Sequence, residues 1–343
     1  MSAVPVPTTF VVDPTASGDA QTRRPVSPRD PGDRTFRLGL GASGASVLAL
    51  MAAVGLFLST QAFRALRSTG VSFLTTAAWQ PDRGTFGIAA VLTGTILIAL
   101  VAVTISFPIA SLTALHVSEV ASKRTKQTLI AMVDLMAAVP SVVYGLWGLF
   151  FLQGQVIGLS RWLSTWLSWI PLFRVDGADP TNPLGNASVY TASTFIAGIV
   201  VALMVMPIQC SVMREVFSQA PPGEREGAYA LGATRWGMIR SVVIPYGMGG
   251  MIGGTMLGLG RALGETIAVL LIISPSFEIN THVLQAGSNS VSSLIALRAP
   301  ESSGFGLSAL MAAGLALFVL TLGINFTASA FVARSRSGAD SEG

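Results

Sequence analysis

Long apolar stretches separated by short polar segments are the dominant pattern along this chain. Six of them are at least 20 residues long, which is the length that an α-helix needs to cross a hydrocarbon core of roughly 30 Å. They cover residues 38–63, 86–114, 129–152, 190–213, 248–273 and 307–331. The pattern therefore predicts an all-α integral membrane protein with six transmembrane helices.

Composition narrows the class of protein further. Hydrophobic residues make up 51% of the chain and charged residues 11%, which is typical of a membrane protein rather than a soluble globule. The net charge of +4 therefore belongs to loops between spans, and no nucleic-acid partner is expected. The single cysteine, Cys210, has no partner within the chain for a disulfide or a cysteine-based site. We expect it to be buried, and we predict no metal site.

The distribution of positive charge predicts the orientation in the membrane. With the N-terminus inside, 14 of the 21 lysines and arginines fall in inner segments and six in outer segments. Cytoplasmic loops of membrane proteins carry such an excess of positive charge. Both termini and the segment 214–247 are therefore predicted to lie in the cytoplasm.

Residues 156–174 are apolar enough to be considered as a seventh span. Arg161 and several serines interrupt this segment, and Pro171 ends it. Four aromatic residues recur in it at helical spacing: Trp162, Trp166, Trp169 and Phe173. Such spacing favours a helix in the outer membrane interface. A seventh span would also reverse the orientation of the later segments, so we favour the interfacial helix.

The fifth stretch, 248–273, is unusual because it contains two ionisable side chains, Arg261 and Glu265. At about 100° per residue, both share one helix face with three glycines: Gly250, Gly254 and Gly258. Small residues at this spacing let another backbone approach closely, and an arginine near the membrane centre offers a fixed positive fork for an oxyanion. Two interpretations stay open: Arg261 and Glu265 line a substrate path, or they neutralise each other within a packed bundle.

Asp134 and Pro140 interrupt the third stretch, 129–152. Pro140 is expected to kink the helix, and kinks in transporters occur where spans flex or line a cavity. Asp134 lies near the inner end of the stretch, where we expect an interfacial charge rather than a proton relay.

The polar segment 221–245 carries signals for helix ends and starts. Pro-Pro-Gly at 221–223 stops the preceding helix, Glu226 favours the beginning of a new one, and Gly232 ends it after about two turns. Two short helices that meet at an angle are predicted. Such an elbow can be gripped by a partner and can pass movement to the neighbouring spans. The alternative is an ordinary amphipathic loop in the interface.

The same segment resembles the EAA loop of ABC-importer permeases, E-A-A-x3-G-x9-I-x-L-P. The corresponding positions here are Glu226, Gly227, Ala228, Gly232, Val242, Ile244 and Pro245. The glutamate, the second glycine and the proline match at their offsets, and the three exchanges are to small or apolar residues. The resemblance implies that this cytoplasmic loop couples the membrane helices to an ATPase.

Further stretches are similar to the phosphate permeases of the Pst system, in particular to their PstC subunits. They are residues 79–81 with 86–87, 138–150 and 257–269. The resemblance covers most of 70–330 and implies the type I ABC importer permease fold. It also implies three partners: a second permease subunit (PstA-like), an ATP-binding ABC ATPase dimer (PstB-like) and a phosphate-binding protein outside the membrane (PstS-like). The family's Arg and Glu associated with phosphate passage correspond to Arg261 and Glu265.

This resemblance implies phosphate import across the bacterial plasma membrane. Together with the composition and the apolar pattern, it divides the chain into a disordered cytoplasmic tail (1–35), which lies outside the resemblance, a first transmembrane helix with an outer loop (36–85), a permease domain (86–333) and a cytoplasmic tail (334–343). No G-x-x-x-x-G-K-[ST] loop is present and only two lysines occur, so no ATPase site, catalytic centre or cofactor is predicted in this chain. Two alternatives stay open: a permease for sulfate or molybdate, and a secondary transporter or intramembrane enzyme using Asp134, Arg261 and Glu265.

Overall fold

The computed structural model describes residues 31–177, 179, 182 and 186–337. The chain forms two units, Met1–Ala53 and Val54–Gly343. In the first unit, the described residues form the beginning of helix α1 (Pro31–Thr69), and their described side chains are exposed. Of the predicted tails, residues 1–30 and 338–343 lie outside the described residues, whereas 31–35 and 334–337 are helical.

Six helical stretches among the described residues are long and apolar enough to cross a membrane, as predicted. Their bounds are Arg34–Thr69, Ala89–Val120, Ser141–Trp166, Thr194–Ser218, Arg235–Gly264 and Gly304–Ala330. The first, second, fourth and sixth contain most of the predicted stretches. The third and the fifth differ most from the prediction, because the chain breaks inside both predicted helices.

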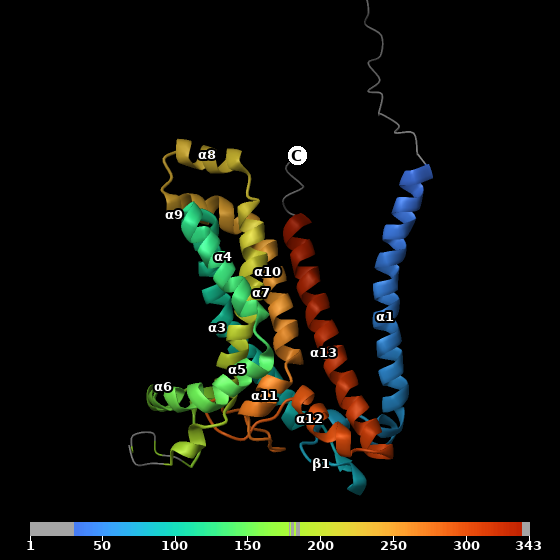
Figure 1. Cartoon of the computed structure of the whole chain (residues 1–343). Helices are drawn as coiled ribbons and strands as arrows, with labels where there is room; N and C mark the ends of the chain where they lie inside the picture. The colour runs from blue at the N-terminus through green and yellow to red at the C-terminus, as the bar shows by residue number, and fades with distance from the viewer. Residues whose placement is uncertain (1–30, 178, 180–181, 183–185, 338–343) are drawn as a thin grey trace, which may run out of the picture. The chain divides into compact units, whose positions relative to one another are not determined.

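Helices α3 (Ala89–Leu115) and α7 (Thr194–Ser218) form the centre of the second unit, and they run side by side (Figure 1). Small residues bring them together: a Cβ atom added to Gly198 would lie 2.4 Å from Val101 Cγ1. Close approach at small residues is the usual packing of membrane helices. Helix α10 (Ile244–Gly264) packs on both, and α13 (Gly304–Ser337) packs on α10.

The third predicted helix, 129–152, is wrong as a single element. Helix α4 (Lys123–Ala138) ends before Val139 and Pro140, both of which are extended, and α5 (Ser141–Trp147) begins after them. The interruption at Pro140 is therefore a full break rather than a kink. A proline cannot donate a hydrogen bond to the preceding turn, and the residue before it avoids helical geometry, which is why Val139 leaves the helix as well.

The segment after this break continues as helix through η3 (Gly148–Leu152) into α6 (Gln153–Trp166). Figure 1 shows α6 lying across the direction of α3, α4 and α7. Its side chains Trp162 and Trp166 are exposed. This arrangement agrees with a helix in the membrane interface, although the helix ends at Trp166 and is followed by the short turn η4 (Pro171–Phe173).

The fifth predicted helix, 248–273, is also broken. Helix α10 ends at Gly264, Glu265 is extended, and α11 (Ile267–Ile272) begins after Thr266. A loop leads from α11 to the short helix α12 (Val291–Arg298), and η7 (Ala299–Glu301) joins α12 to α13. Because α12 contacts α3, α11 and α13, this loop region belongs to the packed body of the second unit.

A small hairpin lies between α1 and α3. After α2 (Ser72–Thr75), strands β1 (Trp79–Gln80) and β2 (Thr85–Phe86) pair antiparallel, with Trp79 opposite Phe86. The turn consists of η1 (Pro81–Arg83) and Gly84, whose φ of +73° favours glycine. Edge-to-face contacts join Phe86 to Phe73, Trp79 and Phe305. We call the end of the bundle with this hairpin, α6 and α12 the loop end (Figure 1).

Candidate substrate path and coupling elbow

The predicted elbow lies at the other end of the bundle, which we call the elbow end (Figure 1). Helix α8 (Pro222–Ala230) begins with Pro222 in its first turn, where a missing N–H costs nothing. Gly232, with φ of +84°, ends it. The backbone N–H groups of Gly232 and Ala233 bond to the carbonyl oxygens of Tyr229 and Ala228 at 2.9 and 3.0 Å, which is the Schellman pattern.

The second arm of the elbow differs from the prediction. Helix α9 (Arg235–Met238) is not a separate short helix, because it continues through the π-helical segment η6 (Ile239–Val243) into α10. Ile244 opens α10 and Pro245 lies in its first turn. Figure 1 shows α8 and α9 lying across the end of the bundle, so the continuous helix must change direction between α9 and α10.

The surface of the elbow is open and partly apolar. Glu226 and Gly227 are exposed, whereas Ala228 is partly buried against the core of the elbow end. Leu231 is 91% exposed, and Tyr229 and Trp236 are exposed beside it. Large apolar side chains that are exposed together mark a site of interaction with another protein or with the membrane.

The two glycines of the elbow allow a matched test of its geometry. Gly232→Ala is expected to speed hydrogen exchange of the amides in 222–233 about fivefold, because a Cβ atom at φ of +84° costs about 1 kcal/mol. Gly227→Ala is expected to leave exchange unchanged or slower, since an added Cβ meets no atom within 4 Å and alanine favours a helix. Equal exchange in the two variants would contradict the assigned Schellman cap.

The three glycines of the fifth stretch lie against α7. Cβ atoms added to Gly250 and Gly258 would lie 2.5 Å from Val216 Cγ2 and Val205 Cγ1, respectively. At Gly254 the nearest atom would be the Gln209 carbonyl oxygen, at 3.3 Å. The glycines therefore set the close contact between α10 and α7, and Arg261 and Glu265 do not share this contact.

Arg261 lies in the last turn of α10 rather than in the middle of a long helix, because the chain leaves helical geometry at Glu265. Its side chain is exposed, and it has no hydrogen-bond or ion-pair partner among the residues that the structure describes. Glu265 is partly buried, and its Oε1 accepts a hydrogen bond from the Ala268 N–H at 3.3 Å. Within this structure, then, the two charges form no direct ion pair. Arg261 is free to meet an anion.

Side chains of α12 hold the break between α10 and α11. The Ser292 hydroxyl donates a hydrogen bond to the Leu263 carbonyl at 3.4 Å, and the Ser293 hydroxyl donates one to the Thr266 carbonyl at 3.3 Å. Both serines are buried. Buried carbonyl groups that a broken helix leaves without partners are costly in a membrane, so these hydroxyls stabilise the break.

The break at Pro140 is stabilised in a similar way, and it lies next to the break between α10 and α11. The Tyr144 hydroxyl donates a hydrogen bond to the Met136 carbonyl at 3.0 Å, across the interruption. Helix α5 packs on α11, where a Cβ atom at Gly145 would lie 2.9 Å from Ala268 Cα. The Arg261 charge is close enough to act on the Tyr144 phenol. The breaks that follow α4 and α10 thus lie near each other, and Arg261 is in the last turn before the second of them.

The roles of three residues were not predicted from the sequence: Tyr144, Ser292 and Ser293. A tyrosine four residues after Pro140 is a signal that could have been used, because its hydroxyl needs a partner in an apolar run. The serines have no comparable signal, since their partners lie 27 and 29 residues away. Asp134 is exposed on α4, and Cys210 is buried.

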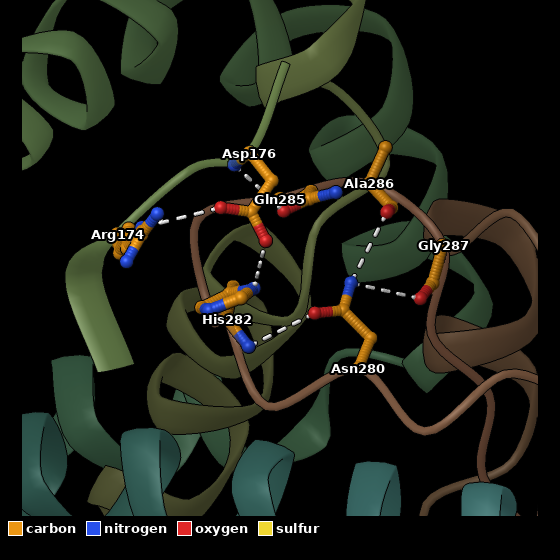
Figure 2. A network of polar contacts seen from close by, with 7 residues as sticks. All are labelled: Arg174, Asp176, Asn280, His282, Gln285, Ala286 and Gly287. Carbon is orange, nitrogen blue, oxygen red and sulfur yellow. Dashed lines mark hydrogen bonds and ion pairs between the residues drawn. The ribbon is translucent and has the colours of Figure 1, made fainter. Parts of the chain in front are cut away.

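A polar network ties two segments of the loop end together (Figure 2). Asp176 lies 3.2 Å from Arg174 Nε and 3.6 Å from His282 Nδ1, and its N–H bonds to Gln285 Oε1. The Asn280 amide bonds to the carbonyl oxygens of Ala286 and Gly287. The segment that follows α11 is therefore held in a defined shape against the segment that follows α6.

This chain is similar in sequence to known membrane transport proteins. Residues 106–337 match the family described as "Binding-protein-dependent transport system inner membrane component". The phosphate transport system permease protein PstC 2 of Mycobacterium tuberculosis is 37% identical over 90% of this chain and 94% of its own length. PstC of Haemophilus influenzae is 36% identical over 80% and 85%, and PstC of Mycobacterium leprae is 38% identical over 80% and 85%.

Solved structures share the fold. A bacterial ABC transporter that imports the acidic polysaccharide alginate has a chain with a TM-score of 0.53 and 19% identity, over 88% of this chain and 96% of that chain. The alginate transporter in complex with its pentasaccharide-bound periplasmic protein gives 0.54 and 18%, over 86% and 93%. The chain therefore belongs to the binding-protein-dependent transport system inner membrane components, and within them to the PstC family of phosphate transport system permease proteins.

Proposed function

We propose that this chain is the permease subunit through which inorganic phosphate crosses the plasma membrane, driven by ATP hydrolysis on a partner subunit. The substrate is supported by relatives that are named phosphate transport permeases and are 36–38% identical over most of the chain. The path is supported by the structure of the two helix breaks.

The observation that carries the proposal is the unpaired Arg261 at the end of α10. It lies in the last turn of α10, just before the break at Glu265, and its charge acts on Tyr144 of α5, the helix that follows the break at Pro140. Non-helical backbone at membrane depth is tolerated where it is buried in protein or lines a water-filled cavity. A guanidinium there binds a phosphate oxygen through charge-assisted hydrogen bonds, and the Glu265 carboxylate four residues away limits how tightly the anion is held, as a transport path requires.

The elbow is the site where we place the ABC ATPase dimer (PstB-like). Support comes from its exposed Tyr229, Leu231 and Trp236 and from the exposed Glu226 of the EAA-like motif. Movement of the ATPase would shift α8 and, through η6 and Pro245, the continuous helix that leads to Arg261. The excess of lysine and arginine in the same segments supports a cytoplasmic elbow and cytoplasmic termini.

Two further partners follow from this proposal. Six spans form one half of a translocation path, so a second permease subunit (PstA-like) would complete it. A phosphate-binding protein (PstS-like) would deliver substrate to the loop end, where the network of Asp176 and His282 shapes the outer surface. No nucleotide or other cofactor is assigned to this chain itself.

The proposal is tested by transport in vesicles that contain this chain with its co-purifying ATPase, second permease and binding protein. We expect ATP-dependent uptake of phosphate that an excess of sulfate or molybdate does not inhibit. Uptake of sulfate or molybdate in preference to phosphate would show that the chain is a permease for another oxyanion. Uptake without any ATPase would contradict the importer mechanism and would favour a secondary transporter.

A further inference from the structure

We propose that an ion pair between Arg225 and Glu119 couples the elbow to α3, as a second mechanical connection beside the covalent one into α10. The proposal rests on the proposed function, in which an ATPase moves α8, and it names the residues that pass this movement to the centre of the bundle. Arg225 belongs to α8, and Glu119 belongs to the π-helical segment η2 (His116–Val120) at the end of α3.

One guanidinium joins three elements at this point. Arg225 Nη2 lies 3.2 Å from Glu119 Oε1 and donates a hydrogen bond to the Phe217 carbonyl, at the end of α7, at 2.7 Å. The Ser118 hydroxyl donates a further hydrogen bond to Glu119 Oε1 at 3.1 Å. The side chains of Glu119 and Arg225 are 4% and 23% exposed, so competition from water is weak and the pair is held tightly.

The attachment of α8 makes this pair mechanically important. Helix α8 has no buried residue, and Ala228 is its partly buried contact with the core of the elbow end. The chain itself links α8 to α7 on one side and to α9 and α10 on the other, but not to α3. A buried ion pair is a weak source of net stability, because desolvation offsets the attraction, so a role in holding α8 to α3 explains it better.

Two π-helical segments adjoin this connection. Segment η2 lies at the end of α3 and carries Glu119, and η6 leads from α9 into α10; π-helical turns are frequent at functional sites in helices. The Phe217 ring lies against α10, where a Cβ atom at Gly247 would approach it to 2.4 Å. A movement of Arg225 would therefore be passed both to α3, through Glu119, and to the end of α7, where Phe217 contacts α10.

The test is the number of phosphate ions imported per ATP hydrolysed by the complete importer in proteoliposomes. We expect Glu119→Gln and Arg225→Gln to lower this ratio on the order of tenfold, which corresponds to a loss of about 1.4 kcal/mol of coupling, while ATP hydrolysis continues. Arg225→Lys keeps the charge and is expected to give an intermediate ratio. Glu215→Gln removes an exposed carboxylate at the end of α7 and is the matched control, with the wild-type ratio.

A double-mutant cycle separates coupling from packing. If the pair acts as one unit, the double variant with glutamine at both positions has a ratio no lower than the worse single variant. The proposal would be overturned if the reduction in the double variant equals the product of the two single reductions. It would also be overturned if uptake and ATP hydrolysis fall in equal proportion in the single variants. If the glutamine variants do not assemble, Arg225→Lys decides: a lowered ratio supports the connection, and a wild-type ratio refutes it.

Failure of the functional proposal gives a different result. In that case the wild-type complex itself shows no ATP-dependent uptake of phosphate. The inference about Arg225 and Glu119 fails when the wild-type complex transports phosphate and the variants transport it with the same ratio to ATP.

Discussion

Arg261→Gln is expected to abolish phosphate uptake while leaving the assembled importer intact. Arg261 has no partner among the described residues, so its replacement by a neutral side chain of similar shape leaves no buried group unsatisfied. Loss of two hydrogen bonds to a charged ligand, at about 1.5–3 kcal/mol each, corresponds to a decrease in uptake of about 100-fold or more. Initial rates of ATP-dependent uptake measure it.

Two further variants make this result specific. Arg67→Gln is the matched control, because Arg67 is also an exposed arginine in the last turn of a helix but lies far along the chain from both breaks. It is expected to transport normally. Arg261→Lys is expected to retain part of the activity, since an ammonium keeps the charge but not the two-pronged geometry of a guanidinium. Normal uptake by Arg261→Gln would rule out Arg261 as part of the path.

Gly258→Ala and Gly250→Ala are expected to destabilise the packing of α10 on α7. An added methyl at Gly258 would lie 2.5 Å from Val205 Cγ1 and 2.6 Å from Gln209 Nε2, and one at Gly250 would lie 2.5 Å from Val216 Cγ2. Overpacking of this kind costs about 1–3 kcal/mol, which for a chain of 343 residues lowers the unfolding midpoint by about 1–2 °C per kcal/mol. Thermal unfolding of the purified protein measures the effect.

The same helix supplies the control. A Cβ atom added to Gly253 or Gly260 meets no atom within 4 Å, so Gly253→Ala and Gly260→Ala are expected to be neutral or up to about 1 kcal/mol stabilising, through the helix preference of alanine. Four variants with the same midpoint would show that α10 does not contact α7 through Gly250 and Gly258.

The number of spans and the beginning of the elbow were determined by the sequence alone. Apolar runs of more than 20 residues specify membrane helices because the hydrocarbon core leaves backbone polar groups no other partner. The end of α8 was equally predictable, because Gly232 takes a left-handed conformation that other residues avoid. The apolar runs and the glycine are both local features of the sequence, so they can be interpreted without knowing how distant segments pack.

The helix breaks were decided by tertiary structure. The stretches 129–152 and 248–273 are each long and apolar enough to be predicted as one span, and Pro140 by itself indicated a kink. What makes full breaks stable are hydroxyl groups from elsewhere: Tyr144 for the first, and Ser292 and Ser293 for the second. Composition along a helix carries no information about such distant donors.

The same reason explains the charged residues. Sequence spacing left open whether Arg261 pairs with Glu265, and the structure turns Glu265 towards the start of α11 because α10 ends one residue earlier. The pairing of Arg225 with Glu119 joins segments more than 100 residues apart. The sequence thus showed which charged side chains lie within or beside the predicted spans, and only the packing of distant segments decided which of them form ion pairs.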